Sequence, residues 1–240
     1  MKQFKIGNVN HSSKHKKAYN YNELVYTIYL SPAKTSGHEV CPSRNEECTL
    51  LCLNESGFNR MSMNNELINK SRIEKTKLFY SNRELFVRLV INEINYYKYL
   101  AELEGLNFSV RLNNTSDLSP ETFYIIDNGK KKNILEIFPD VQFYDYTKVF
   151  NRLKLSEKYP NYDLTFSYSG YNEKECITAI ERGFRVAVVF KNKPSEFWGL
   201  NVIDGDNYDM RYKDPKNVIV GLKFKKVRNS LNENYKFVVQ

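Results

Sequence analysis

Three of the four cysteines in this chain lie within twelve residues, in the segment "CPSRNEECTLLC", and these thiols have the clearest capacity for chemistry. Cys41, Cys48 and Cys52 have the spacing C-x6-C-x3-C. A tight cysteine cluster in a chain without a visible export signal favours metal binding or catalysis over a disulfide framework. We therefore expect the cluster to bind a metal.

Two metal sites are compatible with this spacing. If His38 joins Cys41, Cys48 and Cys52, the four ligands complete a closed structural zinc site of the Cys3His type. If His38 stays out, the three thiolates hold a [4Fe–4S] cluster with one iron open to an exogenous ligand, which is a catalytic arrangement. Unligated thiols packed under the loop are the third alternative, although the neighbouring strings "NEEC" and "NESG" are polar.

The cysteine loop, residues 34–57, follows a short run of β-branched and aromatic residues and precedes a segment with helical spacing. From residue 107 onward, apolar runs alternate with helical ones. This order predicts right-handed βαβ units and an α/β fold, in which a parallel βα-repeat sheet curls into a partial or complete (β/α) barrel within a single domain, residues 21–240. The predicted strands are 23–32, 107–113, 141–147, 162–169, 184–190, 200–206 and 217–224.

Capping residues bound three of the predicted helices. "SNREL" opens the strongest helix with Ser81 as its N-cap in a capping box, and Gly105 ends it. Ser119, followed by Pro120 at the first helical position, opens another helix. "NEKECITAIERG" (172–183) is the third and ends at a glycine.

Polar residues follow almost every predicted strand. In a parallel sheet or barrel the carboxyl ends of the strands meet at one edge, and ligands bind beyond that edge. Amides, carboxylates and lysines there predict a polar pocket with the cysteine loop on its rim. The expected cofactor or substrate contacts are Lys34, Asn114, Asp117, Asp145, Lys148, Ser167, Asp204, Asp206 and Lys223.

Two further segments invite a chemical interpretation. "DGDNYD" (204–209) has acids at alternate positions, like an EF-hand calcium loop, but Asp209 stands where the hand needs glycine and no glutamate closes the loop. We interpret it as an acid-rich turn. Cys176 lies between apolar positions of a predicted helix, so we expect a buried, inert thiol there rather than a fourth ligand.

The chain carries 36 Lys and Arg against 28 Asp and Glu, a net charge of +8, which favours an anionic partner such as nucleic acid or a phosphorylated metabolite. Residues 1–20 hold five lysines and no acid, so we expect a flexible basic arm there, with a dedicated nucleic-acid arm as the alternative. No apolar run approaches the roughly 18 residues of a membrane span. We expect no membrane partner and a cytoplasmic location.

A strand, a loop with three clustered cysteines and a succession of βα units resemble the radical S-adenosylmethionine enzymes. In those enzymes three cysteines hold a [4Fe–4S] cluster whose open iron binds the methionyl part of the cofactor. The resemblance implies this role for Cys41, Cys48 and Cys52, with Asn114 and Asp117 as contacts for the methionyl amino group. The chain departs from the family motif C-x3-C-x2-C and lacks its Gly-Gly-Glu stretch.

A second resemblance covers residues 26–223, most of the chain. It is carried by the strings "LSPAKTSGHEVCP", "VRLNNTSD", "FPDVQFYDYTK", "LTFSYS", "RVAVVF", "VIDGD" and "DPKNVIVGLK". These are similar to a group of bacteriophage-encoded proteins, the gene product 88-like proteins, which share a cysteine-rich loop after the first strand. The resemblance brings no activity with it, and it implies a phage-type protein acting in the cytoplasm of an infected cell.

Two functions from different classes remain. The first is an iron–sulfur enzyme that resembles the radical S-adenosylmethionine enzymes and acts on an unidentified substrate, for which a nucleotide or a nucleic-acid base suits the net charge. The second is a non-enzymatic nucleic-acid-binding protein with a structural zinc held by His38, Cys41, Cys48 and Cys52, in which the basic arm and "KFKK" (223–226) contact phosphates. No Walker loop, nucleophile elbow or dinucleotide fingerprint supports a hydrolase or a transferase.

Overall fold

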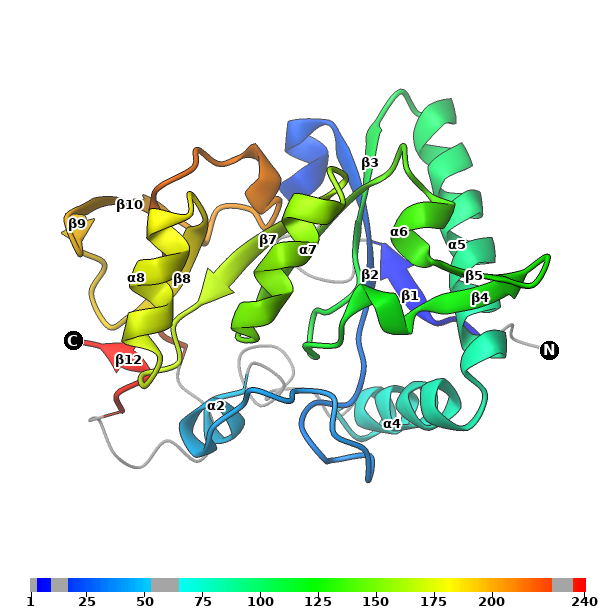
Figure 1. Ribbon diagram of the computed structural model, residues 1–240, viewed down its shortest axis with the longest axis horizontal. Helices are drawn as coiled ribbons and strands as arrows, with labels where there is room; N and C mark the ends of the chain where they lie inside the picture. The colour runs from blue at the N-terminus through cyan, green and yellow to red at the C-terminus, as the bar shows by residue number, and fades with distance from the viewer. Residues whose placement is uncertain (1–3, 10–16, 53–64, 226–234) are drawn as a thin grey trace.

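A mostly parallel sheet of ten strands forms the centre of the protein, which the computed structural model describes over residues 4–9, 17–52, 65–225 and 235–240 (Figure 1). The strands between the two edge strands pair in parallel, and each edge strand pairs antiparallel with its neighbour. The spatial order is β1 (Gly7–Val9), β2 (Glu23–Ile28), β3 (Asn107–Arg111), β6 (Gln142–Thr147), β7 (Tyr162–Ser167), β8 (Arg185–Phe190), β11 (Ile219–Lys223), β10 (Leu200–Asp204) and β9 (Glu196–Phe197), with β12 (Val238–Val239) paired to β8.

Helices connect the parallel strands. Two long helices, α4 (Asn65–Ser81) and α5 (Arg83–Leu103), lie between β2 and β3 in the chain. Right-handed crossovers between strands that are neighbours in both chain and sheet place their helices on one face. Accordingly, Figure 1 shows α7 and α8 in front of β7 and β8. The shorter elements are α2 (Glu46–Leu50), α6 (Ile134–Ile137), α7 (Leu153–Lys158), α8 (Glu173–Glu181) and the 3-10 turns η1 (Tyr19–Tyr21), η3 (Pro120–Thr122), η4 (Phe150–Arg152) and η5 (Arg211–Lys213).

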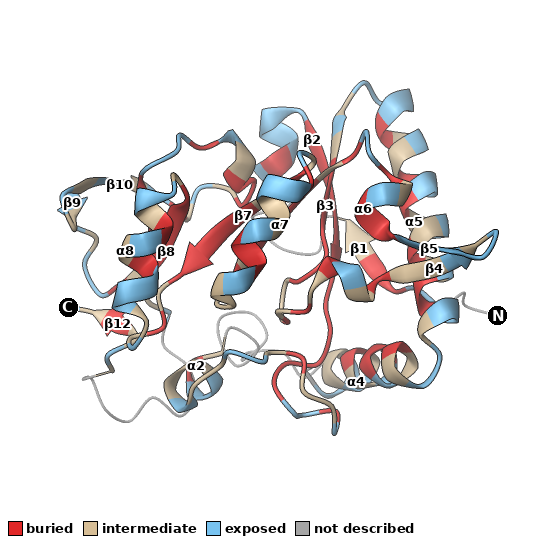
Figure 2. Ribbon diagram, viewed as in Figure 1, coloured by how far each residue is buried: buried red, intermediate tan, exposed pale blue. Residues whose placement is uncertain are grey.

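The main core lies between the helices and one face of the sheet. Helix α5 buries one side, as its spacing predicts, and this side joins a single cluster with alternate residues of the strands (Figure 2). Successive side chains of a strand point to opposite faces, so every second strand residue belongs to this core. Its members include Phe86, Val90, Ile94, Tyr97 and Ala101 of α5 and Tyr26, Val110, Phe143, Leu164 and Val186 of the strands.

The α/β class and all seven predicted strands are confirmed. The described residues show no closed barrel, because β1 and β9 stand at the two ends of the strand order and no pairing between described residues joins them. The order of β10 and β11 is exchanged relative to the chain: β11 pairs with both β8 and β10. This exchange depends on which strand forms hydrogen bonds with β8, and local sequence patterns do not reveal that pairing.

The boundary between α4 and α5 differs from the prediction by one residue. Ser81 is the last residue of α4, and the N-cap of α5 is Asn82, whose side chain accepts a hydrogen bond from the backbone N–H of Leu85 at 3.1 Å. Serine and asparagine are comparable N-caps, so adjacent candidates are not distinguished by residue type. The predicted end of α5 lies close to the observed end: Glu104 is the C-cap, and Gly105 has a left-handed φ of 66°.

The helix predicted after Ser119 is wrong, because Pro120 opens only the short turn η3. A hairpin follows, formed by β4 (Tyr124–Asp127) and β5 (Lys130–Asn133). Its two turn residues, Asn128 and Gly129, both have positive φ, at 49° and 75°. Asn-Gly favours this turn, so the hairpin signal was present in the sequence.

The predicted basic arm, 1–20, is in part an element of the sheet. Its residues Gly7–Val9 form β1, and Ile6 is fully buried. Glu93 of α5 accepts the backbone N–H groups of Ile6 and Gly7, both at 2.8 Å, which fixes this edge strand. Five of the basic or histidine residues of the arm lie outside the described residues: Lys2, His11, Lys14, His15 and Lys16.

Candidate functional site

The described part of the cysteine loop, residues 34–52, lies at the carboxyl edge of the parallel strands, and its predicted remainder, 53–57, lies outside the described residues. In Figure 1 the arrowhead of β7 points toward the side of the molecule where α2 lies. The backbone N–H of Asp117, which follows β3, donates to the carbonyl of Val40 at 2.8 Å. Asn45 Nδ2 donates to the carbonyl of Ser169, which follows β7, at 2.8 Å. These bonds join the loop to the ends of two strands.

Helix α2 carries Cys48 and is held from several sides. Asn45 is its N-cap, and its Oδ1 accepts the backbone N–H of Cys48 at 2.7 Å. Glu47 accepts the backbone N–H of Phe237 at 2.7 Å and the hydroxyl of Tyr171 at 3.0 Å. Segments more than 120 residues apart therefore meet at this short helix.

None of the three cysteines forms a disulfide with another described residue, and each is partly buried. Cys41 Sγ lies 3.8 Å from the carbonyl oxygen of Thr115. The pKa of Cys41 is raised to about 12, first by burial and further by the neighbouring Cys52, Asp117 and Cys48. Among the described residues, no three His, Cys, Asp or Glu side chains are grouped closely enough to hold a metal ion. A metal that used all three thiols would require the loop to close around it.

His38 packs against α4. Its ring stacks on that of Tyr80, with centroids 4.2 Å apart and an interplanar angle of 5°. The Tyr80 hydroxyl donates to the carbonyl of Glu39 at 2.6 Å, which ties the start of the loop to the same helix. His38 therefore has a packing role of its own, which the sequence did not indicate.

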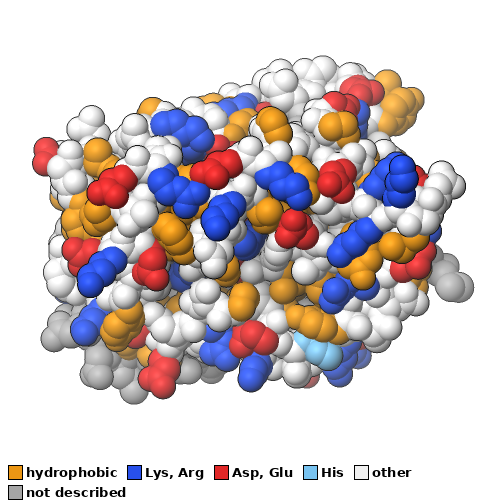
Figure 3. Space-filling model, in the orientation of Figure 1, with side chains coloured by type: hydrophobic (Ala, Val, Ile, Leu, Met, Phe, Trp, Pro, Cys, Tyr) orange, Lys and Arg blue, Asp and Glu red, His pale blue; other side chains and the backbone are white. Residues whose placement is uncertain are grey.

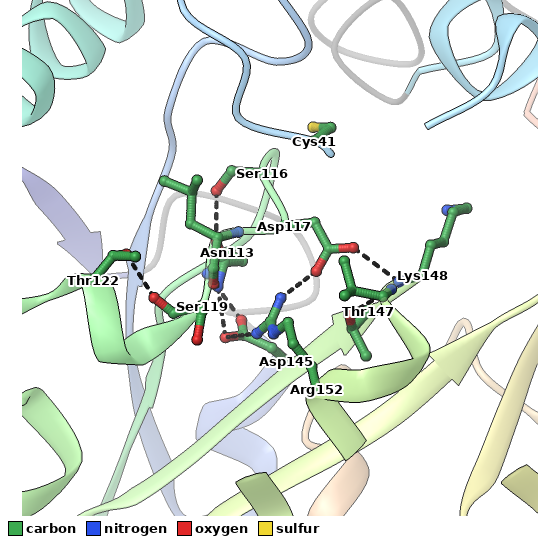
Figure 4. Close-up of polar contacts among 12 residues, drawn as sticks. Cys41, Asn113, Ser116, Asp117, Ser119, Thr122, Asp145, Thr147, Lys148 and Arg152 are labelled. Atoms are coloured by element: carbon green, nitrogen blue, oxygen red, sulfur yellow. Dashed lines mark hydrogen bonds and ion pairs between the residues drawn. The ribbon is translucent and has the colours of Figure 1, made fainter. Parts of the chain in front are cut away.

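Asp145, which the sequence assigns to the pocket, is buried in β6 with 1% exposure. Its carboxylate accepts the backbone N–H of Asn113 at 2.8 Å, Asn113 Nδ2 at 2.9 Å and the hydroxyl of Tyr162 at 3.0 Å (Figure 4). Burial raises the pKa of Asp145, and the charge of Arg152 and the bonds from Asn113 oppose that rise. With its oxygens engaged in this way, Asp145 ties β3, β6 and β7 together.

Asp117 connects the cysteine loop to this buried network. Its carboxylate accepts Arg152 Nη1 and the backbone N–H of Lys148, the latter at 2.8 Å. Figure 4 shows the sulfur of Cys41 on the loop side of Asp117, with the side chain of Lys148 extending away from the network. The ammonium of Lys148 lies 5.4 Å from the ring centroid of Phe237. The structure thus brings Cys41, Asp117, Asp145 and Lys148 to one edge of the sheet.

Three other predicted contacts lie along the same edge. Lys34 is exposed in the turn that precedes the cysteines. Asn114 is half-buried, and its backbone N–H donates to the carbonyl of Ile28 at 3.2 Å. Ser167 is buried, and its carbonyl accepts Asn172 Nδ2 at 3.0 Å.

The remaining predicted residues form a separate group at the far strands. Lys193 pairs with Asp204 at 2.6 Å and with Asp206 at 3.1 Å. Asp206 also accepts the backbone N–H of Lys223 at 2.9 Å. These contacts stabilise the turn after β10, in keeping with an acid-rich turn. The side chain of Cys176 is buried in α8, as expected.

A hollow of about 350 Å³ lies at the opposite, amino edge of the strands. It contains the buried carboxylate of Glu23, which accepts the hydroxyl of Tyr212 at 2.6 Å and pairs with Lys213 at 2.8 Å. The sequence reasoning did not indicate this hollow. Its lining residues are Glu23, Lys98, Ala101, Glu102, Leu106, Asn107, Phe108, Asp140, Val141, Gln142, Tyr212 and Lys213.

The sheet face opposite the helices carries polar residues that the sequence reasoning missed. Arg111 pairs with Asp209, from the segment between β10 and β11, and its guanidinium carbon lies 4.9 Å from the ring centroid of Tyr146. Burial, and then Asp209, raises the pKa of Tyr146. Between the next two strands, Arg185 Nη2 of β8 donates to both oxygens of Asp163 of β7, at 2.8 and 2.9 Å.

A period-two pattern could have revealed this face. Ser109 and Arg111 alternate with Phe108 and Val110, and Thr165 lies between apolar neighbours. Because alternate residues point to opposite faces, Arg111 points away from the core that contains Val110. The predicted contacts are residues at the ends of the strands, so polar residues within the strands are not among them.

The helix-bearing surface is mixed in charge. Figure 3 shows lysines and arginines interspersed with acids over this face, without a continuous basic stripe. No helix among residues 4–9, 17–52, 65–225 and 235–240 combines the length and apolar character needed to cross a membrane.

Comparison with known proteins identifies the family. No curated protein and no solved structure matches the chain. These comparisons give no support to a similarity with radical S-adenosylmethionine enzymes. One family model, described as Gene product 88, matches residues 2–238, nearly the full length, in agreement with the phage-type resemblance of the sequence motifs. The chain therefore belongs to the gene product 88 family.

Proposed function

We propose that this protein binds an iron–sulfur cluster through Cys41, Cys48 and Cys52 and acts at the carboxyl edge of its sheet, in the cytoplasm of an infected cell. The observation that carries the proposal is the position of the loop. Its backbone and side chains are bonded to the segments after β3 and β7, where ligands of parallel α/β proteins bind.

The donor set fits such a cluster in its chemistry. The three cysteines are not paired in disulfides with described residues, and thiolates are the usual ligands of iron–sulfur clusters. Burial raises the pKa of Cys41, and Cys52 and Cys48 raise it further, so a cation among the three would relieve their mutual repulsion and favour the thiolates. Three cysteines leave one iron of a [4Fe–4S] cluster without a protein ligand, and a bound cluster would supply that iron for an exogenous ligand.

The residues around the loop would position it. Asn45 and Glu47 hold α2, which carries Cys48, against the segments that follow β7 and precede β12. Asp117 is already engaged by Arg152 and Lys148, so it acts as a support rather than as a free acceptor. S-adenosylmethionine is the exogenous ligand that the sequence resemblance implies, and Asn114 is then the remaining candidate for its amino group.

Anaerobic purification followed by absorption spectroscopy and metal analysis tests the proposal. We expect a brown protein with about four iron and four sulfide per chain, and loss of both in Cys48→Ala. Cys176→Ala is the matched control, because its thiol lies in α8, and it should keep the cluster. A colourless protein with about one zinc per chain, whose zinc binding is weakened in His38→Ala, would contradict the proposal and support the nucleic-acid-binding alternative.

A further inference from the structure

Several buried hydrogen-bond donors on the sheet face opposite α7 and α8 have no partner among the described residues. They include Arg111 Nε, Arg185 Nε and Nη1, and the hydroxyls of Tyr144 and Thr165. The side chains of Tyr144, Thr165 and Arg185 have no exposed surface, and Arg111 is 8% exposed. We call these four residues the donor patch.

The members of the donor patch lie on four adjacent strands, β3, β6, β7 and β8. Thr165 in β7 is in register with Arg185 in β8. Tyr144 in β6 is in register with Asp163, the carboxylate that Arg185 Nη2 holds. The parallel register that pairs Val110 of β3 with Phe143 of β6 places Arg111 beside Tyr144, on the side away from β7. The two guanidinium groups therefore flank Tyr144 and Thr165.

A buried hydrogen-bond donor without a partner destabilises the folded state. Each loses its hydrogen bonds to water without gaining a partner, and native proteins leave few such groups. Their concentration on four adjacent strands indicates a bound group that accepts hydrogen bonds. Arginine has no acceptor atom, so a ligand that satisfies the donor patch must supply hydrogen-bond acceptors.

The local charge favours an anion over a neutral acceptor. Asp163 is shared by Arg185 and by Lys216, whose Nζ lies 3.1 Å from Oδ2. Arg185, Lys216 and Asp163 together therefore carry one net positive charge. A guanidinium with unoccupied N–H groups is suited to planar or tetrahedral oxyanions.

We propose that the donor patch is an oxyanion-binding site, which takes a phosphate or carboxylate group of a small ligand through Arg185 and Thr165, with Tyr144 and Arg111 completing the contacts. This site is distinct from the cysteine loop and does not depend on the proposed cluster. It goes beyond the proposed function because it assigns an anionic ligand to the opposite face of the sheet from the helices.

Thermal unfolding and calorimetric titration with inorganic phosphate, in chloride buffer of constant ionic strength, test the site. We expect phosphate to raise the Tm of the wild type. Arg185→Lys keeps the charge but removes two unpartnered donors, so it should weaken phosphate binding by about tenfold or more. Arg88→Lys on α5, an exposed arginine paired with Glu84, is the matched control and should bind like the wild type.

Thr165→Val separates ligand binding from folding. It removes an unpartnered hydroxyl at nearly constant shape, so without ligand we expect a Tm equal to or above that of the wild type. Its phosphate affinity should nevertheless fall. Equal phosphate affinity in Thr165→Val, Arg185→Lys and the wild type would overturn the proposal.

Acetate, titrated in parallel, separates the two ligand chemistries. A response to phosphate alone assigns a phosphate group, and a response to acetate assigns a carboxylate. No response of the wild type to either anion would overturn the site and leave buried water as the partner of these donors. The phosphate response should persist in Cys48→Ala, so failure of this site and failure of the cluster are distinguishable.

Discussion

Asn113 gives two hydrogen bonds to the carboxylate of Asp145, from its backbone N–H at 2.8 Å and from Nδ2 at 2.9 Å. These bonds join the end of β3 to the middle of β6. Asn113 Oδ1 accepts the backbone N–H of Leu118 at 2.9 Å, so one side chain also shapes the loop that carries Asp117. The carboxyl edge thus depends on a buried amide–carboxylate contact.

Asp145→Asn should destabilise the protein by about 3 kcal/mol. The new amide keeps one acceptor, but its NH₂ group faces Asn113 Nδ2 and the Tyr162 hydroxyl, and Arg152 loses a nearby negative charge. Urea unfolding measures the loss. Asp127→Asn, which breaks an exposed pair with Lys132, is the control and should change stability by less than about 1 kcal/mol.

The same variant should alter the pH dependence of stability. Burial raises the pKa of Asp145 above its ordinary 3.8, so between these two pKa values the folded chain binds more protons than the unfolded chain. The contribution of Asp145 to stability therefore decreases as the pH rises through that window. The free-energy difference between wild type and Asp145→Asn, measured by urea unfolding, should shrink as the pH rises from about 4. A difference that grows over this range would contradict the raised pKa.

Gly7→Ala should loosen the edge strand β1. A Cβ atom at this position would overlap the ring of Tyr26, which is buried in the main core and donates to Glu93. Overpacking of this kind costs about 1–3 kcal/mol. Hydrogen exchange should show faster exchange at the amides of Ile6 and Gly7, and Asn8→Ala, one residue along the strand, should leave these rates close to those of the wild type.

The thiols of Cys41 and Cys176 should react slowly in the folded, metal-free protein. Burial raises the pKa of each to about 12, and the thiolate is the reactive form. Alkylation by iodoacetamide near neutral pH, followed by mass spectrometry, should modify both sites much more slowly than in the urea-unfolded chain. Equal rates in the two states would contradict the assigned burial.

Asn45→Ala should release the cysteine loop from the sheet. It removes the N-cap of α2, worth about 1 kcal/mol, and the bond to the Ser169 carbonyl. We expect faster hydrogen exchange in α2 and, under the proposed function, a lower iron content. Asn82→Ala removes the N-cap of α5 in the same way but leaves the loop bonds intact, so it should retain the iron.

The sequence by itself determined the seven predicted strands of the sheet, the α/β class and the family. Apolar runs such as "RVAVVF" specify buried strands locally, and the spacing of Phe86, Val90 and Ile94 specifies the buried side of α5. These are short-range patterns, in which neighbouring residues carry the whole signal. The position of the cysteine loop followed from the same logic, because parallel strands place their carboxyl ends together.

Only the tertiary structure decided which polar groups meet. Arg111 and Asp209 are 98 residues apart, and His38 stacks on Tyr80 of α4, which comes much later in the chain. The pairing of distant strands likewise produces the exchange of β10 and β11. It also produces the donor patch on the sheet face opposite α7 and α8. Such contacts depend on register and packing across the sheet, and one residue of register reverses the face to which a side chain points.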